Sequence, residues 1–388
     1  MSSIKDVAKL AGVSVATVSR VINQNAPVEE KTRHKVEEAI RKLHYKPNLL
    51  ARGLRQQRRR LGGSVGSVYA VYEKYREYAK AGELYPRGPG RGKKLGFASV
   101  FGTQPFCIEV EQNVIRQAKL AGFEESDLIL LDNQYDAAVG LENAELMLSQ
   151  KPDLFIEHQA DAKVNHIVAA KFAEAGIPII AIDIPVPGAP FVGVNNWQVA
   201  TMGGKHMAHL IQTKWGGWEA VDLVVLLQNP VGGEVTMLRS EGFAAALTEA
   251  FGERVEAKIV RTDGGMGESD QAKAAMDDVL GAYPDAKKIA VTSLNEETMA
   301  GVIAALQGAG RWNPEDRIII TLGVDDLGKL QIRKGLSDAG VAFFPEKYGE
   351  DLIPAACAIL GGAPVPSHMY VENAIITKEN IDQVYPLK

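Results

Sequence analysis

Apolar residues recur at helical spacing near the start of the chain. The first such group predicts an amphipathic helix and comprises Ile4, Val7, Ala8 and Ala11. Gly12 interrupts this pattern, and a glycine at a helix end accepts the left-handed backbone of a sharp turn. Ser14 is a suitable N-cap for a second helix, which we expect to run to about Asn23. A third helix is predicted over residues 29–43, with a buried stripe of Val36, Ala39, Ile40 and Leu43. Two short helices around a tight turn, supported by a third, form a helix-turn-helix.

From residue 93 the pattern changes to short apolar runs that alternate with amphipathic segments. The runs are typical of strands and read KLGFASVF, DLILLD, DLFIEH, IPIIAID, FVGV, DLVVLLQ, KIAVTSL and RIIITLGVDD. The clearest helices between them are expected over residues 109–121, 162–175, 197–212 and 296–309. Such alternation predicts parallel sheets flanked by helices. The unit occurs twice, ending once near residue 190 and starting again near 221, which predicts two doubly wound lobes with a ligand cleft between them.

The distribution of charge separates the helical head from this α/β body. The 388 residues carry a net charge of −5, but the first 60 contain 14 Lys or Arg and 5 Asp or Glu. A basic head on an acidic body favours a polyanionic partner, with a solvated basic helical domain as the alternative. Only 2 cysteines are present, and the first residues contain no long apolar run, so we expect a cytoplasmic protein without disulfides. No segment approaches the length of a membrane span.

The outward face of the second helix is suited to a DNA major groove. Arg20 can donate two hydrogen bonds to a guanine edge, and Val15 and Ala16 can touch thymine methyl groups. Thr17 and Ser19 can bond phosphates or bases, although small residues at such positions can equally serve helix packing. The candidate DNA contacts in this segment are Ser14, Val15, Ala16, Thr17, Ser19, Arg20 and Asn23.

A possible short helix follows in the segment YKPNLLARGLRQQRRR, residues 45–60. Leu54 lies between Arg52 and Arg55 and could insert between base pairs in a minor groove. A linker helix that packs on its own domain is the alternative interpretation. Leu54 and Arg55 are therefore added to the candidate DNA contacts.

Polar and aromatic residues collect at the expected carboxyl ends of the strands in the body. The candidate ligand contacts among them are Phe106, Asp183, Asn195, Arg239, Asn295, Glu296 and Asp325. Carboxylates, amides and one guanidinium suit a ligand rich in hydroxyls, because each hydroxyl both donates and accepts hydrogen bonds. Any one of these residues alone is more often a helix cap or a turn residue. Their occurrence together at strand ends favours a binding site.

The head and the segment after it resemble a known family. IKDVAKLAGVSVATVSRVIN, VEEKTRHKVEEAIRKLHYKPN and ARGLR are similar to the head and hinge of the lactose-repressor (LacI/GalR) family over about residues 3–57. The resemblance implies that Val15, Ala16 and Arg20 read the major groove. It also implies that Leu54 of each subunit enters the central minor groove of a pseudo-palindromic DNA operator, with Arg55 nearby. One head offers too few contacts for specific affinity, so we expect a homodimer and leave a tetramer open.

The body, over about residues 93–386, resembles the sensor of the same repressors and the sugar-binding proteins of the ribose type. The similarity rests on TQPFC, AIDIP, VNNWQVATMGG, RSEGF, SLNEETMAG and GVDD. It implies two lobes of periplasmic-binding-protein type I, with Phe106 stacked on a sugar. The sugar hydroxyls would be bound by Asp183, Arg239, Asn295 and Asp325. Ile184 stands where ribose binders have Arg and Cys107 where they have a second Phe, which leaves a sugar, polyol or sugar acid as the small-molecule effector.

We therefore expect four parts in the chain. They are a helix-turn-helix DNA-binding domain over 1–46, a hinge helix over 47–57, an inserted linker over 58–92 and a two-lobed sensor and dimerisation domain over 93–388. The insert departs from the family. Its segment VYAVYEKYREYAKAGELY could form a helix with Tyr residues on one face, and its PRGPGRG segment is typical of a flexible linker.

The sequence favours a ligand-responsive transcription regulator, most simply a repressor, with no cofactor. His206 and His209 share a helix face, but no further Cys or His completes a metal site, and no nucleophile is paired with a base. The alternatives are a sugar-binding component of a transport system and a sugar-processing enzyme with a regulatory head. The helix-turn-helix counts against the first, and the lack of a catalytic constellation against the second.

Overall fold

The computed structural model describes residues 10–13, 32, 35, 36, 39, 42 and 68–387. The chain divides into two compact units, residues 1–68 and 69–388. In the first unit Leu10 and Ala11 are helical, and Gly12 has a φ of 65°, as expected where the first helix ends. Val36 and Ala39 are helical and buried, in agreement with the stripe predicted for the third helix.

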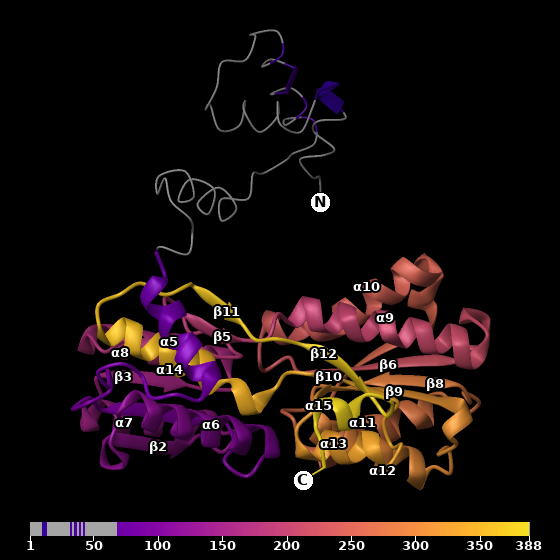
Figure 1. Ribbon diagram of the computed structural model, residues 1–388. Helices are drawn as coiled ribbons and strands as arrows, with labels where there is room; N and C mark the ends of the chain where they lie inside the picture. The colour runs from indigo at the N-terminus through magenta and orange to yellow at the C-terminus, as the bar shows by residue number, and fades with distance from the viewer. Residues whose placement is uncertain are drawn as a thin grey trace. The chain divides into compact units, whose positions relative to one another are not determined.

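The second unit contains two lobes, each built on a six-stranded sheet (Figure 1). The sheet of the first lobe is parallel throughout, in the order β11-β5-β4-β3-β1-β2. Its strands are β1 (Leu95–Ser99), β2 (Leu128–Asp132), β3 (Leu154–Glu157), β4 (Ile179–Ile182), β5 (Phe191–Gly193) and β11 (His368–Tyr370). Its helices are α6 (Pro105–Ala121), α7 (Ala137–Gln150), α8 (Ala162–Ala175) and α14 (Gly349–Leu360). Since α6 packs on one face and α7 and α8 on the other, the central strands are buried on both sides.

The sheet of the second lobe has the order β12-β10-β9-β8-β6-β7, and only β12 runs antiparallel to its neighbour. Its strands are β6 (Leu223–Gln228), β7 (Ile259–Asp263), β8 (Ile289–Thr292), β9 (Arg317–Gly323), β10 (Ala339–Ala342) and β12 (Ala374–Thr377). Its helices are α9 (Asn196–Trp215), α10 (Glu234–Phe251), α11 (Ser269–Ala282), α12 (Glu296–Gly308), α13 (Asp326–Arg333) and α15 (Ile381–Val384). Short 3-10 helices lie at Glu125–Asp127, Trp218–Ala220, Glu253–Lys258, Pro314–Asp316 and Pro345–Lys347.

The prediction of two doubly wound lobes is confirmed, but the chain is shared between them differently than expected. It leaves the first lobe after β5, returns after β10 to form α14 and β11, and crosses again to β12. In Figure 1 the last of these crossings is the yellow segment that runs from β11 to β12. Three chain connections therefore join the lobes.

Residues 69–92 confirm the helix that the first part of the insert could form, but the PRGPGRG segment differs from the flexible linker expected from the sequence. They form helix α5 (Ala70–Ala81) and a series of turns that pack on the first lobe. The Tyr85 N–H donates to Leu120 O (2.9 Å) and the Gly90 N–H to Ala121 O (2.9 Å), both at the end of α6. Gly90 lies so close to Phe123 that a Cβ there would be 2.3 Å from its ring. Gly90 of the PRGPGRG segment thus serves close packing against the first lobe.

No helix in the described part of the chain is long and apolar enough to cross a lipid bilayer.

Candidate functional site between the two lobes

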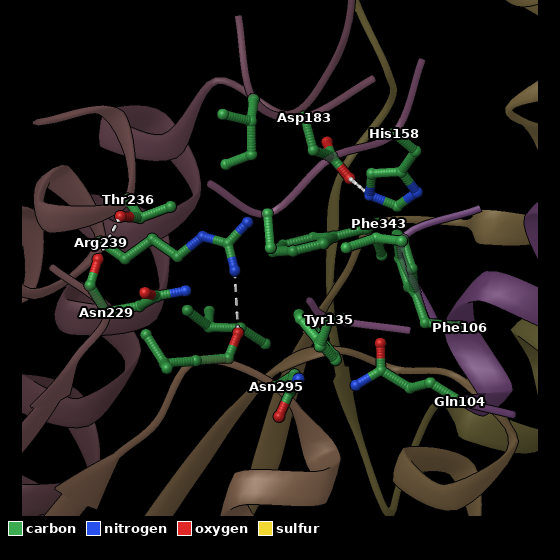
Figure 2. Close-up of a pocket in the computed structure, with 16 residues that line it drawn as sticks. Gln104, Phe106, Tyr135, His158, Asp183, Asn229, Thr236, Arg239, Asn295 and Phe343 are labelled. Atoms are coloured by element: carbon green, nitrogen blue, oxygen red, sulfur yellow. Dashed lines mark hydrogen bonds and ion pairs between the residues drawn. The ribbon is translucent and has the colours of Figure 1, made fainter. Parts of the chain in front are cut away.

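A cavity of about 610 Å³, partly open to solvent, lies where the strands of both sheets end (Figure 2). It is lined by Val100, Gln104, Phe106, Tyr135, His158, Ala160, Asp183, Ile184, Asn229, Thr236, Arg239, Leu294, Asn295, Leu322, Gly323 and Phe343. About half of these side chains are apolar or aromatic, and the others carry hydrogen-bonding groups. This combination suits a small ligand that has both polar edges and C–H surfaces.

Asp183 supplies the carboxylate of the first lobe. It follows β4 directly and adopts a φ of 54°, which turns the chain toward the cavity. Its Oδ1 accepts hydrogen bonds from the Tyr348 hydroxyl (3.1 Å) and the Val194 N–H (3.3 Å). Gly193 makes room for it, since a Cβ there would lie 2.4 Å from Oδ1. Burial raises the pKa of Asp183, while Arg239 and the Tyr348 hydrogen bond act in the opposite direction.

His158 is the second polar group on this side of the cavity. It follows β3, and its Nε2 lies 3.9 Å from Asp183 Oδ2. Burial, with a further contribution from Arg239, lowers the pKa of His158 to about 3, so the imidazole is neutral at physiological pH. Its Nδ1 is buried and has no hydrogen-bond partner among the described residues. A neutral imidazole with one unpaired nitrogen can form a hydrogen bond to a ligand hydroxyl.

Arg239 supplies the cation from the second lobe, and Figure 2 shows it across the cavity from Asp183 and His158. Its Nε donates to Asn196 Oδ1 (2.6 Å) and its Nη1 to Leu294 O (2.9 Å). These two bonds fix the plane of the guanidinium, which lies 5.4 Å from the centre of the Phe343 ring. Because both partners are neutral, the charge of Arg239 is not paired directly within the described part of the chain.

Aromatic rings form the wall near the connections between the lobes. Phe106, in the first turn of α6, meets Phe343 edge to face at 6.4 Å and Tyr348 at 5.6 Å. Tyr135 lies between the lobes, since a Cβ at Gly267 of the second lobe would be 2.7 Å from its hydroxyl. Such rings can cover the C–H faces of a sugar or polyol.

The structure brings four of the seven predicted ligand contacts together at the cavity: Phe106, Asp183, Arg239 and Asn295. Asn195, Glu296 and Asp325 are not among the lining residues. Asn195 and Asp325 cap α9 and α13 by accepting from the Gln198 N–H (3.1 Å) and the Gly328 N–H (3.0 Å). Glu296 is fully buried and accepts from the Val324 N–H. As ligand contacts these three residues stay predictions.

The other lining residues were missed, and several of them also follow strands or lie near strand ends, among them His158, Tyr135 and Phe343. His158 ends the predicted strand DLFIEH, so the rule that selected Asp183 could have selected it. Tyr135 follows β2 by three residues, and Phe343 directly follows β10, a strand that the sequence analysis did not predict. The candidate DNA contacts lie outside the described residues: Ser14, Val15, Ala16, Thr17, Ser19, Arg20, Asn23, Leu54 and Arg55.

No group of His, Cys, Asp or Glu that could hold a metal ion occurs in the part of the chain that the structure describes. The ring centres of His206 and His209 on α9 are 6.1 Å apart, and no third metal-ligating side chain lies with them among the described residues.

Comparison with known proteins agrees with both parts of this architecture. Residues 95–364 match the periplasmic binding protein domain, and residues 3–48 match the bacterial regulatory proteins of the lacI family. The chain belongs to the periplasmic binding protein domain family, and it carries a lacI-family domain in its N-terminal residues. The resemblance noted from the sequence is thereby confirmed for the N-terminal domain and for the body.

The relatives of this chain differ in how much of it they match. It is 58% identical to the HTH-type transcriptional regulator RegA of Clostridium acetobutylicum over 64 residues, which is 16% of this chain and 19% of RegA. The match therefore spans about a fifth of the length of that relative. It is 26% identical to the HTH-type transcriptional repressor PurR of Mannheimia succiniciproducens over 322 residues, 82% of this chain and 81% of PurR.

A solved structure shows the same fold for the body. The Caulobacter myo-inositol binding protein bound to myo-inositol superposes with a TM-score of 0.64 at 22% identity, covering 77% of this chain and 97% of that protein. The two-lobed α/β architecture is therefore that of known solute-binding proteins.

Proposed function

We propose that this protein is a transcription repressor whose binding to a DNA operator is controlled by a sugar, a polyol or a related small polar effector. The observation that carries the proposal is that one chain joins a lacI-family domain at residues 3–48 to a cavity with paired donors and acceptors. A sugar-binding component of a transport system would need the cavity but not the DNA-binding domain.

The effector site consists of Asp183 and Arg239, which face each other across the cavity, with Phe106 and Asn295 beside them. An acceptor from one lobe and a donor from the other bind a hydroxylated ligand best when the lobes are close together. The effector thus stabilises the arrangement in which both lobes touch it. It changes DNA affinity only by its preference for that arrangement.

DNA binding is assigned to the head and hinge as a homodimer on a pseudo-palindromic operator in the cytoplasm. Val15, Ala16 and Arg20 read base edges, with Leu54 and Arg55 at the minor groove. In this proposal the cavity binds the effector and catalyses no reaction. Asp183 and His158 lie near each other, but the described residues around them hold no nucleophile paired with a base.

The test is selection of DNA sequences by the full-length chain from a random pool, followed by affinity measurements with Arg20→Ala. We expect this variant to lose preference for the selected sequence by about 10-fold or more, while it keeps salt-dependent binding to scrambled DNA. Arg116→Ala, which removes an exposed guanidinium of the body, is the control and should change neither. Equal loss of binding on all DNA sequences would contradict a base-reading role for Arg20.

A further inference from the structure

The first turn of α14 has a buried tyrosine hydrogen bond at each of its ends. The hydroxyl of Tyr348, the residue before this helix, donates to Asp183 Oδ1 (3.1 Å) in the effector cavity. The hydroxyl of Tyr72 in α5 donates to Asp351 Oδ1 (2.8 Å), three residues further along α14. Tyr348, Asp183, Tyr72 and Asp351 are all buried, so water does not compete for these bonds.

The turn that joins Tyr348 to Asp351 is rigid. The Tyr348 carbonyl accepts from the Asp351 N–H (3.1 Å) and the Leu352 N–H (3.0 Å). Gly349 packs directly on α6, where an added Cβ would lie 2.5 Å from Asn113 Oδ1. A displacement of the Tyr348 side chain therefore has to be shared with Asp351 rather than absorbed within the turn.

Helix α5 is attached to this turn and to another connection between the lobes. Arg76 forms an ion pair with Asp351, in addition to the Tyr72 hydrogen bond. Lys80 pairs with Glu372 (3.2 Å), which lies in the segment that crosses from β11 to β12. In the sequence, α5 begins two residues after Val68, the last residue of the N-terminal unit. The chain can thus reach α5 from the DNA-binding segment without another element of the body between them.

We propose that Tyr348 is a positioning residue that holds Asp183 in the cavity and couples it, through Asp351, to helix α5. The inference rests on the proposed function, in which Asp183 contacts the effector. An effector hydroxyl that bonds to Asp183 competes with or reorients the Tyr348 hydroxyl. The first turn of α14 shifts with it, and α5 follows because Tyr72 and Arg76 are bonded to that turn. Helix α5 belongs to the insert of residues 58–92. This insert is then the element through which effector binding in the cavity changes the N-terminal DNA-binding domain.

The test is hydrogen–deuterium exchange on the full-length chain without effector or DNA. Tyr348→Phe removes only the hydroxyl bonded to Asp183, and we expect amide exchange in residues 70–81 to rise by about threefold or more. Asp183→Asn changes the acceptor of the same hydrogen bond, so it should also raise amide exchange in residues 70–81. Because coupling is reciprocal, Tyr72→Phe should also raise exchange in the segment after β4, at residues 183–186.

Tyr85→Phe is the matched control. It also removes a buried tyrosine hydroxyl next to α5, bonded to Gln117 Oε1 (3.2 Å), but it has no bond to the cavity. The double variant Tyr72→Phe/Tyr348→Phe should change exchange no more than the larger single change, since both bonds belong to one connection. The proposal is overturned if Tyr348→Phe raises amide exchange in residues 70–81 no more than Tyr85→Phe does. It is also overturned if the increase in exchange in the double variant equals the product of the increases in the Tyr72→Phe and Tyr348→Phe single variants. Neither result bears on whether the protein binds DNA or a sugar, so the proposed function is tested separately.

Discussion

Asp183 shows how neighbouring residues prepare a single side chain for binding. Its backbone is in the left-handed region, Gly193 leaves space for its carboxylate, and Tyr348 fixes one of its oxygens. Burial raises its pKa because a carboxylate loses solvation in the cavity wall. A ligand hydroxyl that donates to Asp183 would replace part of that lost solvation.

At this scale we predict that Asp183→Asn weakens effector binding. The amide can still form hydrogen bonds, but it loses the charge-assisted bond to a ligand hydroxyl, so affinity should fall on the order of 10-fold or more. The measurement is the ligand-induced shift in melting temperature across a panel of sugars, polyols and sugar acids.

Asp325→Asn tests the competing assignment, because Asp325 is also a buried aspartate and was predicted as a ligand contact. Asp325 caps α13 through the Gly328 N–H, and asparagine caps helices as well as aspartate does. We therefore expect Asp325→Asn to keep the ligand-induced shift. Loss of the shift in this variant alone would make Asp325 the contact that the sequence predicted and remove Asp183 from that role.

At the scale of elements, the lobes contact each other through α6 and α13. Glu109 of α6 accepts from the Asp326 N–H (2.9 Å) and forms an ion pair with Lys329 (3.1 Å). The side chains of Glu109 and Lys329 are both 13% exposed, so this pair is screened less than a surface ion pair. It links the lobes beside the cavity, at the N-terminal ends of both helices.

We predict that Glu109→Gln loosens this contact. Amide exchange in α13 should rise by about threefold, because an uncharged side chain binds Lys329 less well. Glu111→Gln on the same helix is the matched control, since Glu111 has no bond to the second lobe among the described residues. Unchanged exchange in α13, or an equal rise in both variants, would show that the ion pair does not hold the lobes together.

The same scale explains which parts of the site the sequence could reveal. Parallel strands end at one edge of a sheet, and the cleft of two doubly wound lobes lies at these edges. Asp183 of the first sheet and Asn295 of the second could therefore be assigned to one cleft without a structure. Asp and Asn after a strand are also the preferred helix N-caps, so sequence alone could not distinguish Asp325 and Asn195 from ligand contacts.

Other parts of the fold left no pattern to interpret. Strand β10 reads only AGVA, too short and too weakly patterned for detection, so the position of Phe343 behind it was not foreseen. The pairing of α5 with α14 joins residues almost 280 positions apart in the chain, and it depends on tertiary contacts that periodicity does not encode.

At the scale of the whole molecule, three parts of the chain are linked by identified contacts and by one covalent connection. The cavity contains groups from both lobes, the first turn of α14 joins the cavity to α5, and the chain continues from α5 to the lacI-family domain. Regulation requires that the effector prefer one arrangement of these parts over another. A molecule that binds both arrangements equally would not change DNA affinity.

The most direct test is the affinity of the full-length chain for its selected DNA sequence, measured with and without a saturating concentration of the sugar or polyol that gives the largest melting shift. We expect that compound to change the affinity by at least about fivefold, and Asp183→Asn to reduce this change. The same affinity in the presence and absence of the bound compound would contradict the central claim that the cavity controls DNA binding.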